Sequence, residues 1–123
     1  MARPREFDEA TVLAQARTLF ASLGYNGTSI DDLVKATGLL RGSLYKAFGS
    51  KQSLFERVLA DVVATFDNSE QQLDLLTVAL KDLATQDARI RQLCLEIIDS
   101  VGEGMPNLLG NNLLAKVKEN PNG

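Results

Sequence analysis

Apolar side chains recur every three or four residues along almost the whole of this 123-residue chain, in segments separated by glycine or by short polar turns. This spacing places them on one face of an α-helix. A β-strand would alternate apolar and polar residues at every second position, and we find no segment with that pattern. The sequence therefore predicts an all-α fold of about seven helices, each burying one apolar stripe.

The expected helices are bounded by capping residues and breakers. They cover roughly residues 8–23, 28–37, 40–48, 51–66, 70–83, 87–101 and 108–117. Thr28 is expected to cap the second helix with Asp31 in return, and Ser69 the fifth with Gln72. Residues 102–106, with two glycines and a proline, are expected to form a loop.

The composition excludes several classes of protein. Hydrophobic residues make up 45% and charged residues 24% of the chain, which is typical of a globular protein and not of a disordered one. There is no histidine, so a catalytic triad or a histidine base is excluded, and the single cysteine makes a zinc site of the usual kind untenable. No apolar run is long enough to span a membrane. The first residues of the sequence are polar and lack the apolar segment of a signal peptide. We expect a cytoplasmic protein that is not an enzyme and has no metal or cofactor.

The net charge of −3 is unevenly divided between the two halves of the chain. Residues 1–57 hold eight Arg and Lys against six acids, which gives +2, whereas residues 58–123 hold five against ten, which gives −5. The N-terminal half is therefore suited to face phosphate, and the C-terminal half to face solvent or a partner.

The stretch from Thr28 to Phe48 is the most informative about function, because it joins two short helical segments by a tight turn at Gly38. This is the pattern of a helix-turn-helix, whose second helix enters the major groove of DNA. The outward residues of that second helix are small, hydroxylic, aromatic or basic: Arg41, Gly42, Ser43, Tyr45, Lys46 and Ala47. No Asp or Glu occurs in the 23 residues between Asp32 and Glu56, as an anionic ligand requires.

The same region resembles the DNA-binding domain of the tetracycline-repressor (TetR/AcrR) family over about residues 3–66. The resemblance rests on residues at fixed spacing: Gly24, Tyr25, Thr28, Ser29, Ile30, Thr37, Gly38, Gly42, Ser43, Leu44, Tyr45, Phe48, Gly49, Ser50, Lys51 and Leu54. It implies a sequence-specific transcriptional regulator, by family default a repressor. Residues 1–50 would form the DNA-binding domain and residues 51–123 a helical regulatory and dimerisation region.

The resemblance also implies which residues touch a double-stranded DNA operator. Contacts with the sugar–phosphate backbone are implied for Thr28, Ser29, Tyr45 and Lys51. Contacts in the major groove are implied for Arg41, Gly42, Ser43 and Lys46. Arg3 and Arg5 would form an arm in the minor groove, although a solvated tail is an equal alternative. Alternatives also stay open for Tyr45, as a filler between helices, and for Lys51, as an ordinary surface lysine.

The sequence departs from the family in two places. Leu40 stands where the family often has Ser or Thr, so the recognition helix loses an N-cap worth about 1 kcal/mol. An alternative role for Leu40 is an apolar contact with a thymine methyl group. Only 57 residues follow Phe66, fewer than the second half of the family usually has.

For that second half the resemblance implies a small apolar inducer that releases the operator, and coupling to DNA through the fourth helix. The candidate lining residues of the inducer pocket are Val62, Phe66, Leu80, Leu93, Cys94 and Ile97. Cys94 on an apolar face is more simply a buried, inert thiol.

The last apolar stripe predicts either internal packing or a subunit contact, and we expect a homodimer built from the sixth and last helices. Its residues are Leu108, Leu109, Leu113, Leu114 and Val117. Two alternatives remain: a DNA-binding module without ligand regulation, and a protein-interaction module that has kept the scaffold but lost DNA binding.

Overall fold

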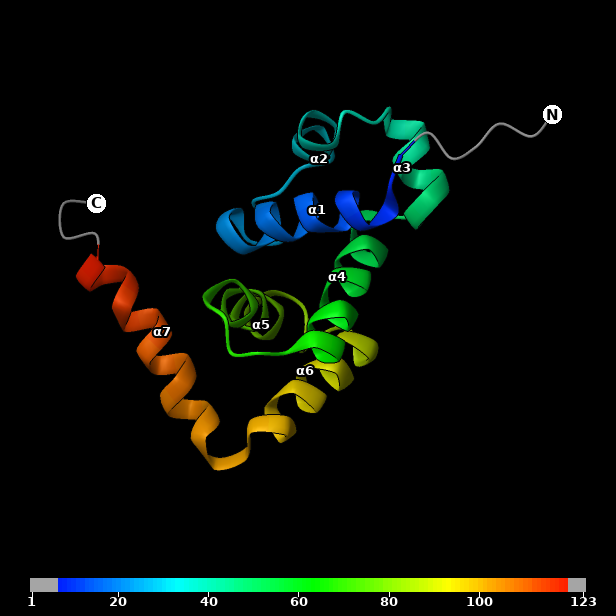
Figure 1. Cartoon of the computed structure of the whole chain (residues 1–123). Helices are drawn as coiled ribbons and strands as arrows, with labels where there is room; N and C mark the ends of the chain where they lie inside the picture. The colour runs from blue at the N-terminus through cyan, green and yellow to red at the C-terminus, as the bar shows by residue number, and fades with distance from the viewer. Residues whose placement is uncertain (1–6, 120–123) are drawn as a thin grey trace.

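The structure, a computed structural model, describes residues 7–119 as an assembly of seven α-helices (Figure 1). They are α1 (Glu9–Leu23), α2 (Ile30–Thr37), α3 (Arg41–Phe48), α4 (Lys51–Thr65), α5 (Glu70–Asp82), α6 (Ala88–Val101) and, after the short 3-10 turn η1 (Gly102–Gly104), α7 (Met105–Glu119). No strand occurs within the described residues, and the all-α prediction is confirmed. None of these helices is long and apolar enough to cross a membrane.

The helix α1 lies between two groups of helices. Figure 1 shows α2 and α3 on one side of it and α5 on the other, while α4 runs from the end of α3 past α1 toward α6. The last helix, α7, turns away from α6 at η1 and packs along α5. The α2–α3 pair is therefore at one end of the molecule, carried by α1 and α4.

A single hydrophobic cluster runs through both halves of the chain. It extends from Val12 in α1 to Met105 at the start of α7. At its centre the ring of Phe55 packs edge-on against Phe20 and Tyr25, with centroid distances of 5.0 and 5.4 Å. Because α1, α4, α5 and α6 all contribute to this cluster, the N-terminal helices are fixed on the later ones.

The start of α2 lies one residue later than the sequence suggested. Ser29, not Thr28, is the N-cap: its hydroxyl accepts the N–H of Asp32 at 2.9 Å, and its own N–H donates to the Asp32 carboxylate at 2.8 Å. These bonds lower the pKa of Asp32 from its ordinary value. Thr28 is buried instead, and its hydroxyl donates to the carbonyl of Gly24 at 2.7 Å.

Two other local predictions were wrong. Ser69 makes no side-chain capping bond, and the side chain of Gln72 accepts the N–H of Asp67 and donates to the carbonyl of Thr65 instead of returning to Ser69. The expected loop at 102–106 is only the short turn η1, since α7 already begins at Met105. Proline is tolerated in the first turn of a helix, where its missing N–H breaks no hydrogen bond.

Candidate nucleic-acid interface

The turn between α2 and α3 is set by a glycine and a threonine. Gly38 ends α2 in the left-handed conformation (φ 74°), and its N–H donates to the carbonyl of Val34 at 2.9 Å. The hydroxyl of Thr37 donates to the carbonyl of Leu33 and accepts the N–H of Leu39, so the chain is guided directly into the next helix. Leu33 and Leu44 are buried, which holds the two short helices against the core.

The outer surface of α3 has the composition that the sequence predicted except at Ala47, which was expected to face outward but packs against the core. Leu44 and Phe48 point into the core. The residues predicted for the major groove lie on this one helix, with Ser43 half-buried and the others exposed: Arg41, Gly42, Ser43 and Lys46. Tyr45 is 42% exposed, so its side chain is presented to solvent and does not fill a gap between helices. That these side chains contact DNA stays a prediction.

An ion pair that the sequence did not reveal lies at the start of α3. The guanidinium of Arg41 donates to the carboxylate of Asp31 in α2, and both side chains are exposed. Asp31 lies two residues before the start of the acid-free stretch, but the turn at Gly38 brings the first residue of α3 back beside it. An exposed pair of this kind contributes less than about 1 kcal/mol, so a phosphate or a base edge can compete for Arg41.

Lys51, the first residue of α4, is already engaged within the protein. Its ammonium donates to the carbonyls of Tyr25 and Thr28, at 3.0 and 3.1 Å. It also lies 4.2 Å from the centroid of the Tyr25 ring, in the geometry of a cation–π contact. Lys51 is thus not a free surface lysine, because it fastens the turn that precedes α2 to α4. That its third N–H contacts a phosphate stays a prediction.

Thr28 is a clear correction to the predicted interface. Its side chain has no exposed surface and its hydroxyl is bonded to Gly24, so it is not available to a phosphate. Ser29 is exposed next to it. Arg3 and Arg5 lie outside the described residues.

Several polar side chains that sequence analysis missed position the interface from a distance. Arg57 of α4 pairs with Glu9 of α1 and lies 5.6 Å from the centroid of the Phe48 ring. Arg17 of α1 donates to Gln71 of α5 at 2.9 Å. The partners are about 50 residues apart in the chain, so no local pattern could have paired them.

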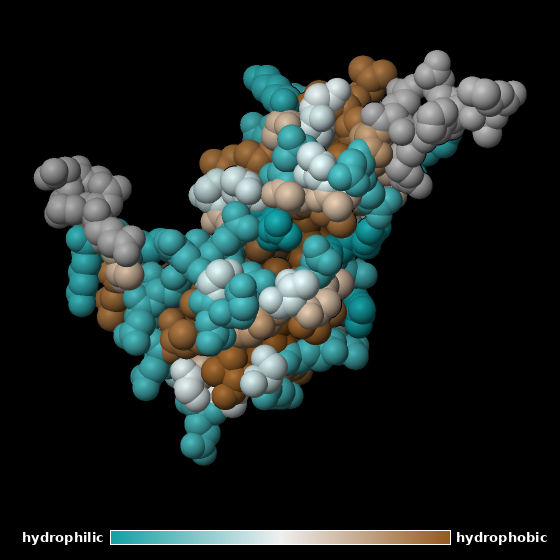
Figure 2. Space-filling model, in the orientation of Figure 1, coloured by the Kyte–Doolittle hydropathy of each residue, from teal (hydrophilic) through white to brown (hydrophobic). Residues whose placement is uncertain are grey.

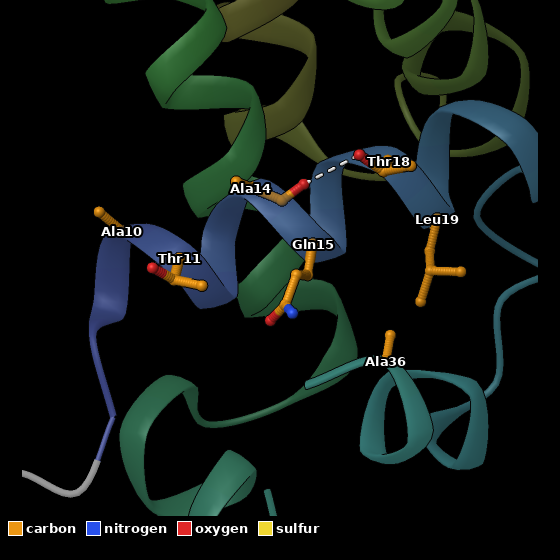
Figure 3. A pocket seen from close by; sticks show the side chains of 7 residues that line it. All are labelled: Ala10, Thr11, Ala14, Gln15, Thr18, Leu19 and Ala36. Atoms are coloured by element: carbon orange, nitrogen blue, oxygen red, sulfur yellow. Dashed lines mark hydrogen bonds between the residues drawn. The ribbon is translucent and has the colours of Figure 1, made fainter. Parts of the chain in front are cut away.

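The residues predicted to line an inducer pocket are packed together in the core. Val62, Leu93, Cys94 and Ile97 are buried, and Phe66 and Leu80 are half-buried against the same cluster. Burial raises the pKa of the Cys94 thiol to about 11, as expected of an inert thiol. The hollow that the structure does show lies elsewhere, between α1 and α2 (Figure 3).

That hollow is open and has a volume of about 550 Å³. Its walls are formed mainly by small or polar side chains of α1: Ala10, Thr11, Ala14, Gln15, Thr18, Leu19, and by Ala36 of α2. The hydroxyl of Thr18 is occupied by the carbonyl of Ala14 at 3.1 Å. Among the residues described, no group of histidine, cysteine or acidic side chains is arranged to hold a metal ion.

Comparison with known proteins places these residues among bacterial regulators. Residues 12–58 match the sequence model described as "Bacterial regulatory proteins, tetR family". The chain is 47% identical over 55 residues to the uncharacterized HTH-type transcriptional regulator YezE of Bacillus subtilis (strain 168), which is 45% of this chain and 28% of that protein. No solved structure gives a significant match.

Two repressors of Escherichia coli (strain K12) are also similar. The HTH-type transcriptional repressor ComR is 42% identical over 64 residues, which is 52% of this chain and 30% of ComR. The HTH-type transcriptional repressor BdcR is 40% identical over 63 residues, which is 51% of this chain and 32% of BdcR. The matched segments thus span less than a third of each relative, and these relatives are named as regulators, not enzymes.

The contacts of Lys51 lead to a prediction about stability. Lys51→Met should lower the free energy of unfolding by about 1 kcal/mol, because two carbonyls lose a charged hydrogen-bond donor. Urea denaturation followed by circular dichroism measures this. The matched control is Lys46→Met on the exposed face of α3, which should change stability by less than about 0.5 kcal/mol. Equal effects of the two substitutions would contradict the anchoring role of Lys51.

Proposed function

Because residues 12–58 match the model of the tetR family of bacterial regulatory proteins, we propose that the protein belongs to this family, binds a DNA operator and represses transcription. The observation that carries the proposal is the α2–Gly38–α3 unit, which presents Arg41, Tyr45 and Lys46 on an exposed helix face. A helix of this kind enters the major groove, where base edges and phosphates accept hydrogen bonds.

The structure changes which residues we assign to the interface. We keep Arg41, Gly42, Ser43 and Lys46 for the major groove and assign Ser29 and Tyr45 to the phosphate backbone. Thr28 becomes a structural residue. Lys51 acts through the turn at Tyr25–Thr28, which sets the approach of α2 to the backbone. An N-terminal arm formed by Arg3 and Arg5 remains part of the proposal.

We further propose that the protein is a homodimer. In α7 the predicted stripe divides, because Leu108 and Leu109 pack against the core whereas Leu113, Leu114 and Val117 are exposed, as is Leu95 in α6. Apolar side chains of this size on neighbouring turns are typical of a surface that a partner covers. A symmetric dimer would present two copies of α3 to two half-sites about 34 Å apart.

We also propose that a small apolar ligand releases the protein from its operator. The protein would act in the cytoplasm. The proposal of ligand release rests on α4, which anchors the turn before α2 at one end and contributes Val62 to the core shared with α6 at the other. We keep the division into a DNA-binding part (1–50) and a regulatory and dimerisation part (51–123), joined by this helix. A DNA-binding module without ligand regulation is the second candidate, and the close packing of Val62, Leu93 and Ile97 favours it.

Operator binding is tested by a mobility-shift assay with the DNA that flanks the protein's own gene. Tyr45→Ala and Lys51→Ala should each weaken binding to all sequences, because they act on the backbone contacts. Arg41→Ala and Lys46→Ala should cost about 1–3 kcal/mol on the preferred site and relax sequence preference. Lys81→Ala, an exposed position on α5, is the control that should bind like the parent. Equal binding by all of these variants and the parent would refute the assignment.

The oligomeric state is tested by light scattering at tens of micromolar protein. We expect a dimer, because Leu114 and its apolar neighbours on α7 are too exposed for a stable monomer surface. Leu114→Asp should shift the protein to the monomer, since a charge is costly to bury in a subunit contact. Gln86→Asp, at an exposed site before α6, adds the same charge and should leave the dimer intact. A monomeric parent protein would disprove the homodimer.

A further inference from the structure

Leu40, the residue just before α3, is the most exposed large hydrophobic side chain among the residues that the structure describes, at 76%. It holds the N-cap position in an extended conformation, and it makes no side-chain hydrogen bond to the helix. A serine or threonine there would satisfy one of the free N–H groups of α3. The chain therefore exposes an apolar group at a position where a polar one would stabilise the helix.

The surface around Leu40 is open. An added Cβ on Gly42, in the first turn of α3, would meet nothing within 4 Å, so the start of the helix is uncrowded at that residue as well. The guanidinium of Arg41 is held at Asp31 of α2. Figure 2 shows hydrophobic residues reaching the surface at the end of the molecule formed by α2 and α3, among hydrophilic ones. A flat partner can therefore approach Leu40 closely.

The position of Leu40 decides which partner fits, given the DNA binding proposed above. In a helix-turn-helix the N-terminal residues of the second helix contact base edges, and Leu40 leads directly into that helix. The phosphates and almost every base-edge group on the floor of the major groove are polar. The exception is the C5-methyl group of thymine, which is the one apolar group that a base presents there.

We propose that Leu40 is a specificity-determining residue that packs against the C5-methyl group of a thymine in each half-site of the operator. The contact selects thymine over cytosine at that position because cytosine lacks the methyl group and a leucine side chain cannot bond to its amino group. This inference rests on the proposed function and deepens it. Leu40 is therefore exposed in the free protein because its apolar contact forms only when DNA is bound. This contact explains why a leucine stands where a capping residue would stabilise the helix.

The test uses operator DNA selected by the parent protein from a random library. Each thymine is then replaced by deoxyuridine, symmetrically in the two half-sites, which removes only the methyl group. For the parent protein we expect one position at which this replacement weakens binding by about three- to fivefold per half-site, the effect of one buried methyl group. Leu40→Ala should bind thymine and deoxyuridine equally at that position.

Two further variants separate the contact from helix stability. Leu40→Ser restores a capping hydroxyl and should bind DNA without telling thymine from deoxyuridine. Leu23→Ala, at another exposed leucine outside α2 and α3, should discriminate as the parent does. If no thymine is sensitive, or if Leu40→Ala keeps the parent's penalty, the inference is overturned. It is also overturned if Leu40→Ala changes only the oligomeric state. A parent protein that selects no DNA at all would instead overturn the proposed function.

Discussion

The ammonium group of Lys51 lies over the ring of Tyr25 and donates to the carbonyls of Tyr25 and Thr28. Tyr25 in turn stacks on Phe20 of α1 and packs edge-on against Phe55 of α4. One contact set therefore joins the end of α1, the turn before α2 and the first turn of α4. Since α2 and α3 are short, their orientation depends on this anchor together with the burial of Leu33 and Leu44 in the core.

The same first turns of α4 also contact the start of α6. Gln52 donates to the carboxylate of Asp87, and Glu56 lies 3.8 Å from the guanidinium of Arg89. Burial, together with the negative charge of Asp87, raises the pKa of Tyr25. These contacts link the start of α6 to the first turns of α4, next to the turn that precedes α2.

The sequence predicted those features of the fold that depend on residues close together in the chain. The helices and the turn at Gly38 could be predicted, because periodicity and a left-handed cap are properties of neighbouring residues. The cap of α2 was misplaced because Thr28 and Ser29 are both capping residues, and each has an aspartate three positions later. The burial of Thr28 decided between them, and burial is a property of the whole fold.

At the interface, too, only the features set by neighbouring residues could be predicted. Arg41, Tyr45 and Lys46 were predicted to share an outer helix face, and they do. The pairing of Arg41 with Asp31 and the engagement of Lys51 were not predicted, since each depends on how two elements meet in space. An acid-free run in the sequence is therefore not an acid-free surface. In α7, the division between buried and exposed leucines likewise depended on the angle at which the helix leaves η1.

We propose that the exposed face of α3 binds DNA through its cationic and polar side chains. The salt dependence of binding to a duplex measures this most directly, because each phosphate neutralised by the protein releases counterions. The logarithm of the binding constant should fall steeply and linearly with the logarithm of salt concentration, and Lys46→Ala should reduce the slope by about one unit. Binding that does not change with salt, or a slope unaltered by Lys46→Ala, Arg41→Ala and Tyr45→Ala together, would contradict the account.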